Sequence, residues 1–363
     1  MNLNENKPTT SRAKTTMSAI QKVGQGKASL NDGVAIPEYG PSDLLLKPLY
    51  SGICTTDLHV LYHGMGRKEF PLTMGHEFSA VVVGIGSEVN SYIGTERKIK
   101  VGDRVTVEPL FPCGKCDSCL RGRTNLCSSM SHLGIFDEGA YADYVRVPSY
   151  RTHLLPDSVS DLAGAFIEPL SCAINFIDRS ELKPGNSVVI LGGGSIGQMA
   201  VQVALASGAG QVILSEPVAK KRELALKLGA HAVIDPINEN LVERVKELTD
   251  TKGVDIVIEC VGVPATVSQM LNLVKRGGRC VLAGAPVKPV EIDFLPLWYG
   301  EVELVAAHAT AWQFPRAMKL IENGDINVEA ALESVVPFSE GVKALEKAYN
   351  SNEIGKLVIQ HNG

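Results

Sequence analysis

The chain has 363 residues, of which 45% are hydrophobic, and it carries a formal net charge of −5. This length predicts two domains, because one hydrophobic core seldom serves more than about 250–300 residues. An acidic chain lacks the basic face that nucleic-acid phosphates require. No apolar run reaches the roughly 18 residues of a membrane span, so we expect neither a nucleic-acid nor a membrane partner.

The N-terminal stretch MNLNENKPTTSRAKTT is polar and lacks the apolar core of a secretory signal. We expect it to form a frayed tail ahead of the first strand; a remnant of an expression vector is the alternative. The expected compartment is the cytoplasm, where thiols stay reduced. Clustered cysteines then indicate metal binding more than disulfides.

Residues 17–160 are predicted to be mainly β. The runs LLLKPLYSGIC, SAVVVGIG, DRVTVEP and YADYVRVP are short, apolar and separated by glycine and proline turns. Few helical patterns interrupt them, so this segment predicts a mostly β domain.

From about residue 187 strands and helices alternate. The runs in order are SVVIL, SIGQMAVQVALASGAG, QVILSE, KKRELALKLGA, HAVID, NLVERVKELT, VDIVIECVG, TVSQMLNLVKRGG, RCVLAG and VELVAA. Short buried strands alternating with amphipathic helices predict βαβ units and a parallel sheet. In this pattern TVSQMLNLVKRGG is one of the helices, and the block covers roughly residues 168–307.

Two helices and a strand are predicted after residue 308. FPRAMKLIENG is a helix that stops at Gly324, and SEGVKALEKAYNS is a helix capped by Ser339. GKLVIQ closes the chain as a strand. A strand that follows the alternating block indicates a return to the first domain.

The segment VVILGGGSIGQMA contains Gly192, Gly194 and Gly197 in the spacing G-x-G-x-x-G. This spacing is informative because it lies between a predicted strand and a predicted helix. The glycines permit a tight turn, the close approach of a pyrophosphate, and close packing of helix on strand. Backbone N–H groups at the start of the helix can then bind the phosphates.

Glu216 ends the next predicted strand about 20 residues later, where a carboxylate can bind the ribose hydroxyls and repel a 2′-phosphate. This favours NAD over NADP. The nearby Lys220, Lys221 and Arg222 keep NADP as an alternative, and a solvated strand-end acid is the plainer interpretation of Glu216. The candidate cofactor-binding residues are Gly192, Gly194, Ser195, Ile196, Gly197, Glu216, Lys221, Val261 and Lys356.

Half of the 8 cysteines lie in one polar loop, at about residues 108–130, with the spacing C-x2-C-x2-C-x7-C. They are Cys113, Cys116, Cys119 and Cys127. Four thiolates in one loop can surround a structural zinc ion. An iron–sulfur cluster uses similar ligands and is the alternative. A site closed by four thiolates would brace the loop and perform no chemistry.

A second group combines different ligand types. The motifs SGICTTDLHVLYHG, MGHEFSA and FIEPLSCA supply Cys54, Thr56, Asp57, His59, His76, Glu77 and Glu168. Cysteine, histidine and a carboxylate can hold zinc and leave a position for a water or substrate oxygen. Taken singly, His76 fits a hydrogen-bonded core histidine and Cys54 a small buried apolar group. Their combination with the glycine turn and the cysteine loop favours a catalytic metal.

Together, GICTTDLH, GHEFSAVVVGIG, CGKCDSCLRGRTNLC, IEPLSCA and LGGGSIG resemble the zinc-dependent alcohol and polyol dehydrogenase branch of the medium-chain dehydrogenase/reductase family. The resemblance covers nearly all of residues 17–360. It implies an α/β protein with a GroES-like, mainly β catalytic domain (residues 1–167 and 308–363) and a Rossmann domain with a doubly wound parallel sheet (168–307). The active site is expected in the cleft between the domains, in a homodimer or homotetramer.

By the same resemblance, Cys54 and His76 are catalytic zinc ligands, and Glu77 is a ligand or becomes one as zinc moves. Glu168 stands where simple alcohol dehydrogenases have a cysteine ligand. A glutamate there is similar to the sorbitol, threonine and butanediol dehydrogenases, in which it holds zinc directly or through water. Asp57 would orient a ligand, and the loop cysteines match a structural zinc lobe, giving two zinc ions per subunit.

The implied reaction transfers hydride between a secondary alcohol and nicotinamide, with a polyol, sugar alcohol, diol or threonine-like compound as substrate. The resemblance implies a proton relay from substrate to Thr56, the cofactor ribose, His59 and water; a surface histidine is the plainer interpretation of His59. His63 and His132 receive no role. Lys356 is expected to reach the pyrophosphate, and the candidates for the pocket wall are His308, Phe136, Leu295 and Trp298.

Three other functions fit parts of the sequence. A zinc-independent, NADPH-dependent reductase of the same superfamily would lack the Cys/His/Glu set. A redox sensor that binds NAD and zinc without turnover would need neither the relay nor an open metal position. A zinc-ribbon interaction module is disfavoured by the acidic charge and the single cysteine cluster.

Overall fold

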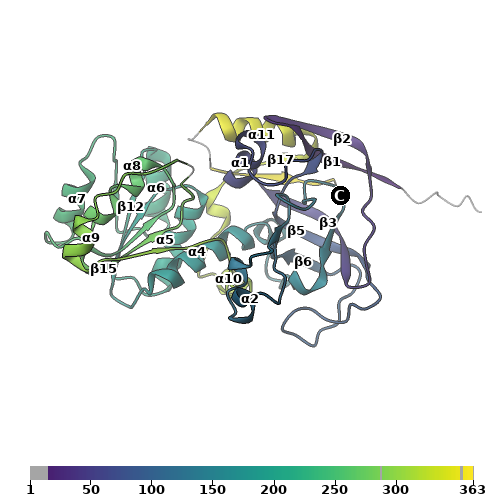
Figure 1. Cartoon of the computed structure of the whole chain (residues 1–363), viewed down its shortest axis with the longest axis horizontal. Coiled ribbons are helices and arrows are strands. Elements are labelled where there is room, and N and C mark those ends of the chain that lie inside the picture. The colour runs from purple at the N-terminus through teal and green to yellow at the C-terminus, as the bar shows by residue number, and fades with distance from the viewer. Residues whose placement is uncertain (1–14, 287, 352–354, 363) are drawn as a thin grey trace, which may run out of the picture.

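The computed structural model describes residues 15–286, 288–351 and 355–362. The first fourteen residues of the predicted N-terminal tail therefore lie outside the described residues. Figure 1 shows two lobes side by side. The N-terminal segment (purple) and the C-terminal segment (yellow) share one lobe, and the middle of the chain forms the other. Within the described ranges, no helix is long and apolar enough to cross a membrane.

The first lobe is built on β strands from both ends of the chain. Among the described residues its main sheet has the path β10 (Thr152–Leu154), β6 (Arg104–Val107), β5 (Glu77–Ile85), β3 (Asp43–Gly52), β18 (Lys356–Gln360) and β17 (Leu332–Pro337), with β9 (Val145–Pro148) also paired to β3. A smaller sheet contains β2 (Lys27–Ala35), β1 (Thr16–Gly24) and β4 (Leu72–Thr73). The pairing of β18 with β3 shows that the chain returns to the first domain.

The second lobe contains a parallel sheet, as predicted. Its order among the described strands is β13 (Ala232–Ile234), β12 (Gln211–Ser215), β11 (Ser187–Leu191), β14 (Val254–Glu259), β15 (Val274–Leu282) and β16 (Glu303–Ala306). Every neighbouring pair is parallel. This is the doubly wound order that places a crevice beyond the carboxyl ends of β11 and β14. The predicted limits at 167/168 and 307/308 stay predictions.

Helices, 3₁₀ turns and one small sheet complete the described fold. The α-helices are α1 (Thr55–His63), α2 (Asp117–Leu120), α3 (Asp161–Gly164), α4 (Ile167–Ser180), α5 (Ser195–Ala206), α6 (Ala219–Lys227), α7 (Leu241–Leu248), α8 (Pro264–Val267), α9 (Leu295–Gly300), α10 (Phe314–Glu322) and α11 (Gly341–Asn350). The 3₁₀ turns are η1 (Thr124–Leu126), η2 (Ser149–Arg151), η3 (Met270–Asn272), η4 (Glu329–Ala331) and η5 (Phe338–Glu340). Strands β7 (Leu110–Phe111) and β8 (Ser131–His132) form a two-stranded antiparallel sheet.

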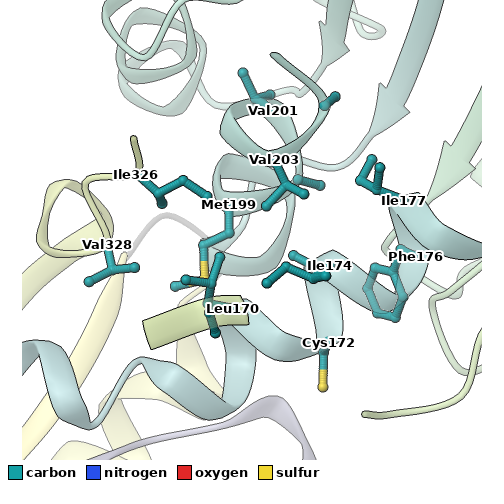
Figure 2. Packing of buried hydrophobic residues seen from close by; sticks show 14 of the residues in the cluster. Leu170, Cys172, Ile174, Phe176, Ile177, Met199, Val201, Val203, Ile326 and Val328 are labelled. Atoms are coloured by element: carbon teal, nitrogen blue, oxygen red, sulfur yellow. The ribbon is translucent and has the colours of Figure 1, made fainter. Parts of the chain in front are cut away.

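Helix α4 connects the two lobes. Figure 2 shows its side chains Leu170 and Ile174 facing Met199 and Val203 of α5, with Ile326 and Val328 packed at one side. Burial of such aliphatic side chains stabilises the fold by about 1.5–3 kcal/mol each. This packing fixes α4, and with it Glu168 at its first turn, against the lobe that contains the parallel sheet.

Two predicted elements were wrong. TVSQMLNLVKRGG does not form one helix: it contains the end of α8 and the turn η3, and the strand β15 starts at Val274. Val274 pairs in parallel with Val254, so a ladder partner distant in sequence overrides the local helical pattern. Ser339 does not cap α11, because it lies within η5 and the cap position is Glu340, which makes no side-chain capping bond.

Candidate active site

The start of helix α1 fixes the position of Cys54. The Cys54 thiol accepts a hydrogen bond from the Thr56 N–H at 3.4 Å, and the Asp57 carboxylate accepts one from the Cys54 N–H at 2.9 Å. These reciprocal contacts form a capping box, which satisfies N–H groups that a helix start leaves unpaired. Cys54 is thereby held two residues beyond the end of β3.

His76 and Glu77 reach the same point from the neighbouring strand. Glu77 of β5 lies opposite Gly52 of β3 in the antiparallel register. Both side chains are buried, and the ligand atoms of Cys54, His76 and Glu77 lie within 4.8 Å of one another. The register of two strands thus gathers a thiol, an imidazole and a carboxylate at one place; we call these three residues the catalytic cluster.

A buried carboxylate supports His76. Asp57 Oδ1 lies 3.3 Å from His76 Nδ1, and the other oxygen, Oδ2, accepts a hydrogen bond from the Tyr141 hydroxyl at 2.7 Å. The Tyr141 hydroxyl is also 2.9 Å from the carbonyl of Gly52. Asp57 faces Nδ1, which leaves the other ring nitrogen of His76 for a metal.

Glu77 has a buried cationic partner, Lys356 of β18, with which it forms an ion pair. The Glu77 charge, followed by that of Cys54, raises the pKa of Lys356 against the lowering effect of burial. In this structure the Lys356 ammonium contacts the catalytic cluster, and its reach to the pyrophosphate stays a prediction. A returning strand carries the residue to a site that the sequence did not indicate.

Glu168 lies beside the catalytic cluster, outside the group of mutually close ligand atoms. Burial, together with the Glu77 carboxylate, raises the pKa of Glu168 to about 7, although His76 and Lys356 oppose the change. The Cys172 thiol, one helical turn later on α4, lies 3.5 Å from Glu168 Oε1. Figure 2 shows Cys172 pointing away from the α4–α5 packing.

Thr56 and His59 lie three residues apart on α1 and are partly exposed. Residues with this spacing occupy neighbouring positions on one helical face. Burial, and then the charge of His63, lower the pKa of His59. His59 is therefore neutral over most of the physiological pH range.

The glycine turn follows β11 as predicted. Gly192 has a positive φ of 99°, and a Cβ on Gly197 would lie 1.9 Å from the Gly192 carbonyl oxygen. A Cβ on Gly194 would meet nothing within 4 Å, so backbone approach from solvent is open there. Val261 lies beside the turn, because a Cβ on Gly192 would be 2.4 Å from its side chain. Ser195 and Ile196 begin α5, where helix N–H groups can face a phosphate.

Glu216 lies at the crevice directly after β12. Its Oε2 accepts a hydrogen bond from the Gly193 N–H at 2.6 Å, and its Oε1 accepts one from the Val218 N–H at 2.9 Å. The adjacent cations Lys220 and Arg222 pair with Glu333 and Asp235, each at 2.9 Å. Lys221 is partly buried, and its carbonyl accepts a hydrogen bond from Gln198 of α5.

The four loop cysteines converge. Cys113, Cys116, Cys119 and Cys127 place their sulfur atoms within 4.8 Å of one another. The N–H groups of Cys113 and Ser129 lie 3.2 and 3.3 Å from the Cys127 sulfur. Hydrogen bonds from the Cys119 and Ser128 backbones lower the pKa of Cys116 to about 6. We call residues 108–130 the cysteine lobe.

Known proteins match this chain over almost its whole length. The GroES-like domain model of alcohol dehydrogenases matches residues 40–157, and the zinc-binding dehydrogenase model matches residues 195–323. The 2-dehydro-3-deoxy-L-galactonate 5-dehydrogenase of Pseudoalteromonas atlantica is 37% identical over 95% of this chain and 99% of its own. The sorbitol dehydrogenase of Bacillus subtilis is 32% identical over 90% of this chain and 92% of its own.

The chain belongs to the zinc-dependent medium-chain alcohol dehydrogenase family. Solved structures of similar proteins support this family assignment. A protein described as a zinc-binding dehydrogenase of Sinorhizobium meliloti 1021, bound to NADP, is 36% identical with a TM-score of 0.88, covering 96% of this chain and 100% of that one. The 2R,3R-butanediol dehydrogenase of Bacillus subtilis is 27% identical with a TM-score of 0.86, covering 95% and 100%.

Both metal sites of this family member fit zinc by their donors. Thiolate, imidazole and carboxylate are zinc ligands, and the 4.8 Å limit on the catalytic cluster allows one ion to contact all three. Buried Asp57 supplies the outer partner that metal-bound histidines have. In the cysteine lobe, hydrogen bonds from the backbone lower the pKa of Cys116 and so favour its thiolate form, which is the form that binds metal.

The sequence analysis assigned no role to two residues that lie near the catalytic cluster of this dehydrogenase. Tyr141, which is fully buried, belongs to no recognisable motif, and only its contacts reveal it. His132 has its ring centroid 5.1 Å from that of His76, and its Nδ1 lies 2.8 Å from the Leu133 carbonyl. Burial, and then the charge of His76, lower the pKa of His132 to about 3.

The predicted pocket wall of this dehydrogenase is corrected in part. Leu295 and Trp298 belong to α9, which Figure 1 places at the far end of the dinucleotide-binding lobe. Within one chain they therefore do not line the cleft. Phe136 is exposed on the loop after His132, and His308 contacts Asn125 of the cysteine lobe.

Proposed function

We propose that this protein is a zinc-dependent, NAD-linked dehydrogenase that oxidises a secondary alcohol in a polyol or sugar-acid substrate. The observation that carries the proposal is the catalytic cluster of Cys54, His76 and Glu77, gathered beside a doubly wound sheet with a glycine turn. The sugar-derived substrates named for two relatives support the substrate class.

The chain's own residues hold the reacting groups in place. When bound, zinc supplies a Lewis acid for the alcohol oxygen, and the nicotinamide supplies the hydride acceptor. Asp57 holds the imidazole of His76, and Lys356 balances the charge of buried Glu77. Thr56 and His59 offer two proton-accepting positions on one face of α1, so a substrate proton can leave toward solvent.

The preference for NAD rests on Glu216 and its surroundings. Its carboxylate is fixed at the glycine turn, where it would repel a 2′-phosphate. Arg222, a cation that could bind such a phosphate, is already paired with Asp235 and with the carbonyls of Glu216 and Pro217. The NADP bound to a 36% identical protein makes this preference a point to test.

Self-association is proposed through the exposed edge of the parallel sheet. Among the described strands, β16 ends the sheet and pairs with β15 alone. Close by in the chain, Phe294, Leu295, Trp298 and Tyr299 are 57%, 56%, 72% and 63% exposed. An edge strand flanked by apolar side chains favours contact with a second copy.

Activity and metal content test the reaction together. Cys54→Ala should lose one of two metal equivalents and fall to about one thousandth of the wild-type turnover with a polyol, because alcohol activation is lost. Cys280→Ala, at a buried position in the dinucleotide-binding lobe, is the matched control. It should keep both metal equivalents and the wild-type turnover. Full turnover by Cys54→Ala, or by metal-free protein, would contradict the proposal.

The cofactor preference is tested by Glu216→Gln. The amide keeps an oxygen acceptor and removes the negative charge, so kcat/KM with NADP should rise by about tenfold or more relative to NAD. The measurement is the kcat/KM ratio for the two cofactors with one alcohol. An unchanged ratio would show that Glu216 does not select the cofactor.

A further inference from the structure

The cysteine lobe makes a direct contact with the segment that follows the last strand of the parallel sheet. Asn125 lies in η1, two residues before Cys127, and it is buried. Its Nδ2 donates a hydrogen bond to the His308 carbonyl at 2.8 Å, and His308 Nδ1 lies 3.3 Å from the Asn125 carbonyl. The carbonyl can only accept, so Nδ1 carries the proton in this reciprocal pair.

Helix α4 holds the same segment from a second side. Asn175 Nδ2 lies 2.7 Å from the Ala309 carbonyl and 3.4 Å from the His308 carbonyl. The Asn175 side-chain oxygen lies 3.5 Å from Gln313 Nε2. Since α4 also carries Glu168, the segment is tied to the helix that supplies the fourth candidate ligand.

Residues at the edge of the main sheet of the first lobe hold the segment from a third side. Arg151 is buried, forms an ion pair with buried Glu108 at 2.7 Å, and places its guanidinium 5.1 Å from the centre of the Trp312 ring. His153, on the same carboxylate, stacks on Phe314 with ring centroids 5.3 Å apart. We call residues 308–314 the connecting segment.

The backbone of the connecting segment is strained. Ala309 and Trp312 have positive φ values of 49° and 70°, which non-glycine residues rarely adopt. Such conformations persist only where surrounding contacts impose them. The three sets of contacts described above are therefore what holds the segment in this form.

The connecting segment also lies near the catalytic cluster. His308 is close enough to His132 for their charges to interact, and the His132 ring is 5.1 Å from that of His76. Hydrogen bonds thus join Asn125 to His308, an electrostatic interaction relates His308 to His132, and a ring contact joins His132 to His76 of the catalytic cluster.

We propose that Asn125 is a positioning residue through which the cysteine lobe holds the connecting segment at the cleft, so that metal binding in the lobe sets the geometry of the active site. A lobe closed by four thiolates performs no chemistry, and this contact gives it a part in catalysis. The kinetic consequence rests on the proposed function; the structural consequence does not.

Trp312 provides a reporter for the segment. The chain has 2 tryptophans, so Trp298→Phe leaves Trp312 as the single one. In this background Asn125→Ala should raise the acrylamide quenching constant of Trp312 by about twofold or more, because loss of a buried hydrogen bond favours local opening. Ser128→Ala, an exposed change in the same lobe, is the matched control and should leave quenching unchanged.

Kinetics and metal content complete the test. Asn125→Ala should retain two metal equivalents while kcat/KM for the alcohol falls by about three- to tenfold. Cys119→Ser, which removes a lobe ligand, should raise Trp312 quenching in the same way. Unchanged quenching in Asn125→Ala overturns the inference whether or not the protein is active. If quenching increases in Asn125→Ala but the wild-type protein oxidises no alcohol, the result would contradict the proposed function alone.

Discussion

Two buried carboxylates at the catalytic cluster, Glu77 and Asp57, each have specific partners. Glu77 faces Lys356, and Asp57 faces His76 and Tyr141. An ion taken out of water is costly, and removal of one member of a buried pair leaves the other uncompensated. These partners are therefore as necessary to the site as the ligands themselves.

Lys356→Met should lower the free energy of unfolding by about 3 kcal/mol, because it leaves the Glu77 carboxylate buried without its counter-charge. Denaturant unfolding of metal-free protein measures the change. The double variant Glu77→Gln/Lys356→Met should recover most of the loss. If the single and double variants unfold alike, the ion pair does not stabilise the site.

The acid limb of the kcat/KM profile should lie below pH 6.5, the ordinary pKa of histidine, if neutral His59 accepts the proton. Burial and the neighbouring His63 charge both disfavour protonated His59 and so lower its pKa. Removing one repelling charge in His63→Gln should raise that pKa and move the limb to higher pH. If the acid limb stays at the same pH in His63→Gln, the limb belongs to a group other than His59.

At the scale of elements, short local signals place each chemical group. The capping box of α1 positions Cys54, and the pairing of β3 with β5 brings His76 and Glu77 to it. The glycine turn lets α5 pack directly on the end of β11. The site residues thus lie at helix starts and strand ends, and the sheets hold these ends in fixed positions.

Substitution by alanine should have different effects on stability and NAD binding at two glycines of the turn. Gly197→Ala places a Cβ 1.9 Å from the Gly192 carbonyl, so the fold should lose about 1–3 kcal/mol of stability. Gly194→Ala meets no atom within 4 Å, so stability should be kept while NAD affinity falls as the methyl occupies the path of the pyrophosphate. Thermal unfolding and NAD titration separate the two effects. Equal losses of stability would contradict this assignment.

At the scale of the whole molecule, the two lobes are joined by α4 and by the connecting segment. The α4–α5 packing is apolar, whereas the connecting segment is held by polar side chains from the cysteine lobe and α4. The apolar contact fixes the lobes together, and the directional polar contacts fix the position of the connecting segment.

Trp298→Glu should shift the protein toward monomers, because a charge replaces an aromatic side chain that is 72% exposed beside the sheet edge. Sedimentation velocity measures the change. Ile237→Glu is the control: this residue is 75% exposed but follows β13 at the opposite edge of the sheet. A monomeric wild type, or an equal effect of both variants, would rule out this interface.

Much of the fold and of the site was predictable from local patterns. The alternation of apolar runs predicted the parallel sheet, and the glycine spacing predicted the turn after β11. Cysteine spacing predicted the lobe, since ligands within one loop are close by necessity. The failed helix at TVSQMLNLVKRGG shows the limit of such patterns, because the ladder partner of Val274 lies elsewhere in the chain.

The sequence by itself determined the types of ligand, the glycine turn and the alternating strands, because each depends on residues a few positions apart. Only the tertiary structure decided that Lys356 faces Glu77, that Tyr141 holds Asp57 across 84 residues, and that Asn125 holds His308 across 183. These contacts depend on how distant segments pack. Packing is set by burial and strand register over the whole chain, and no local pattern records it.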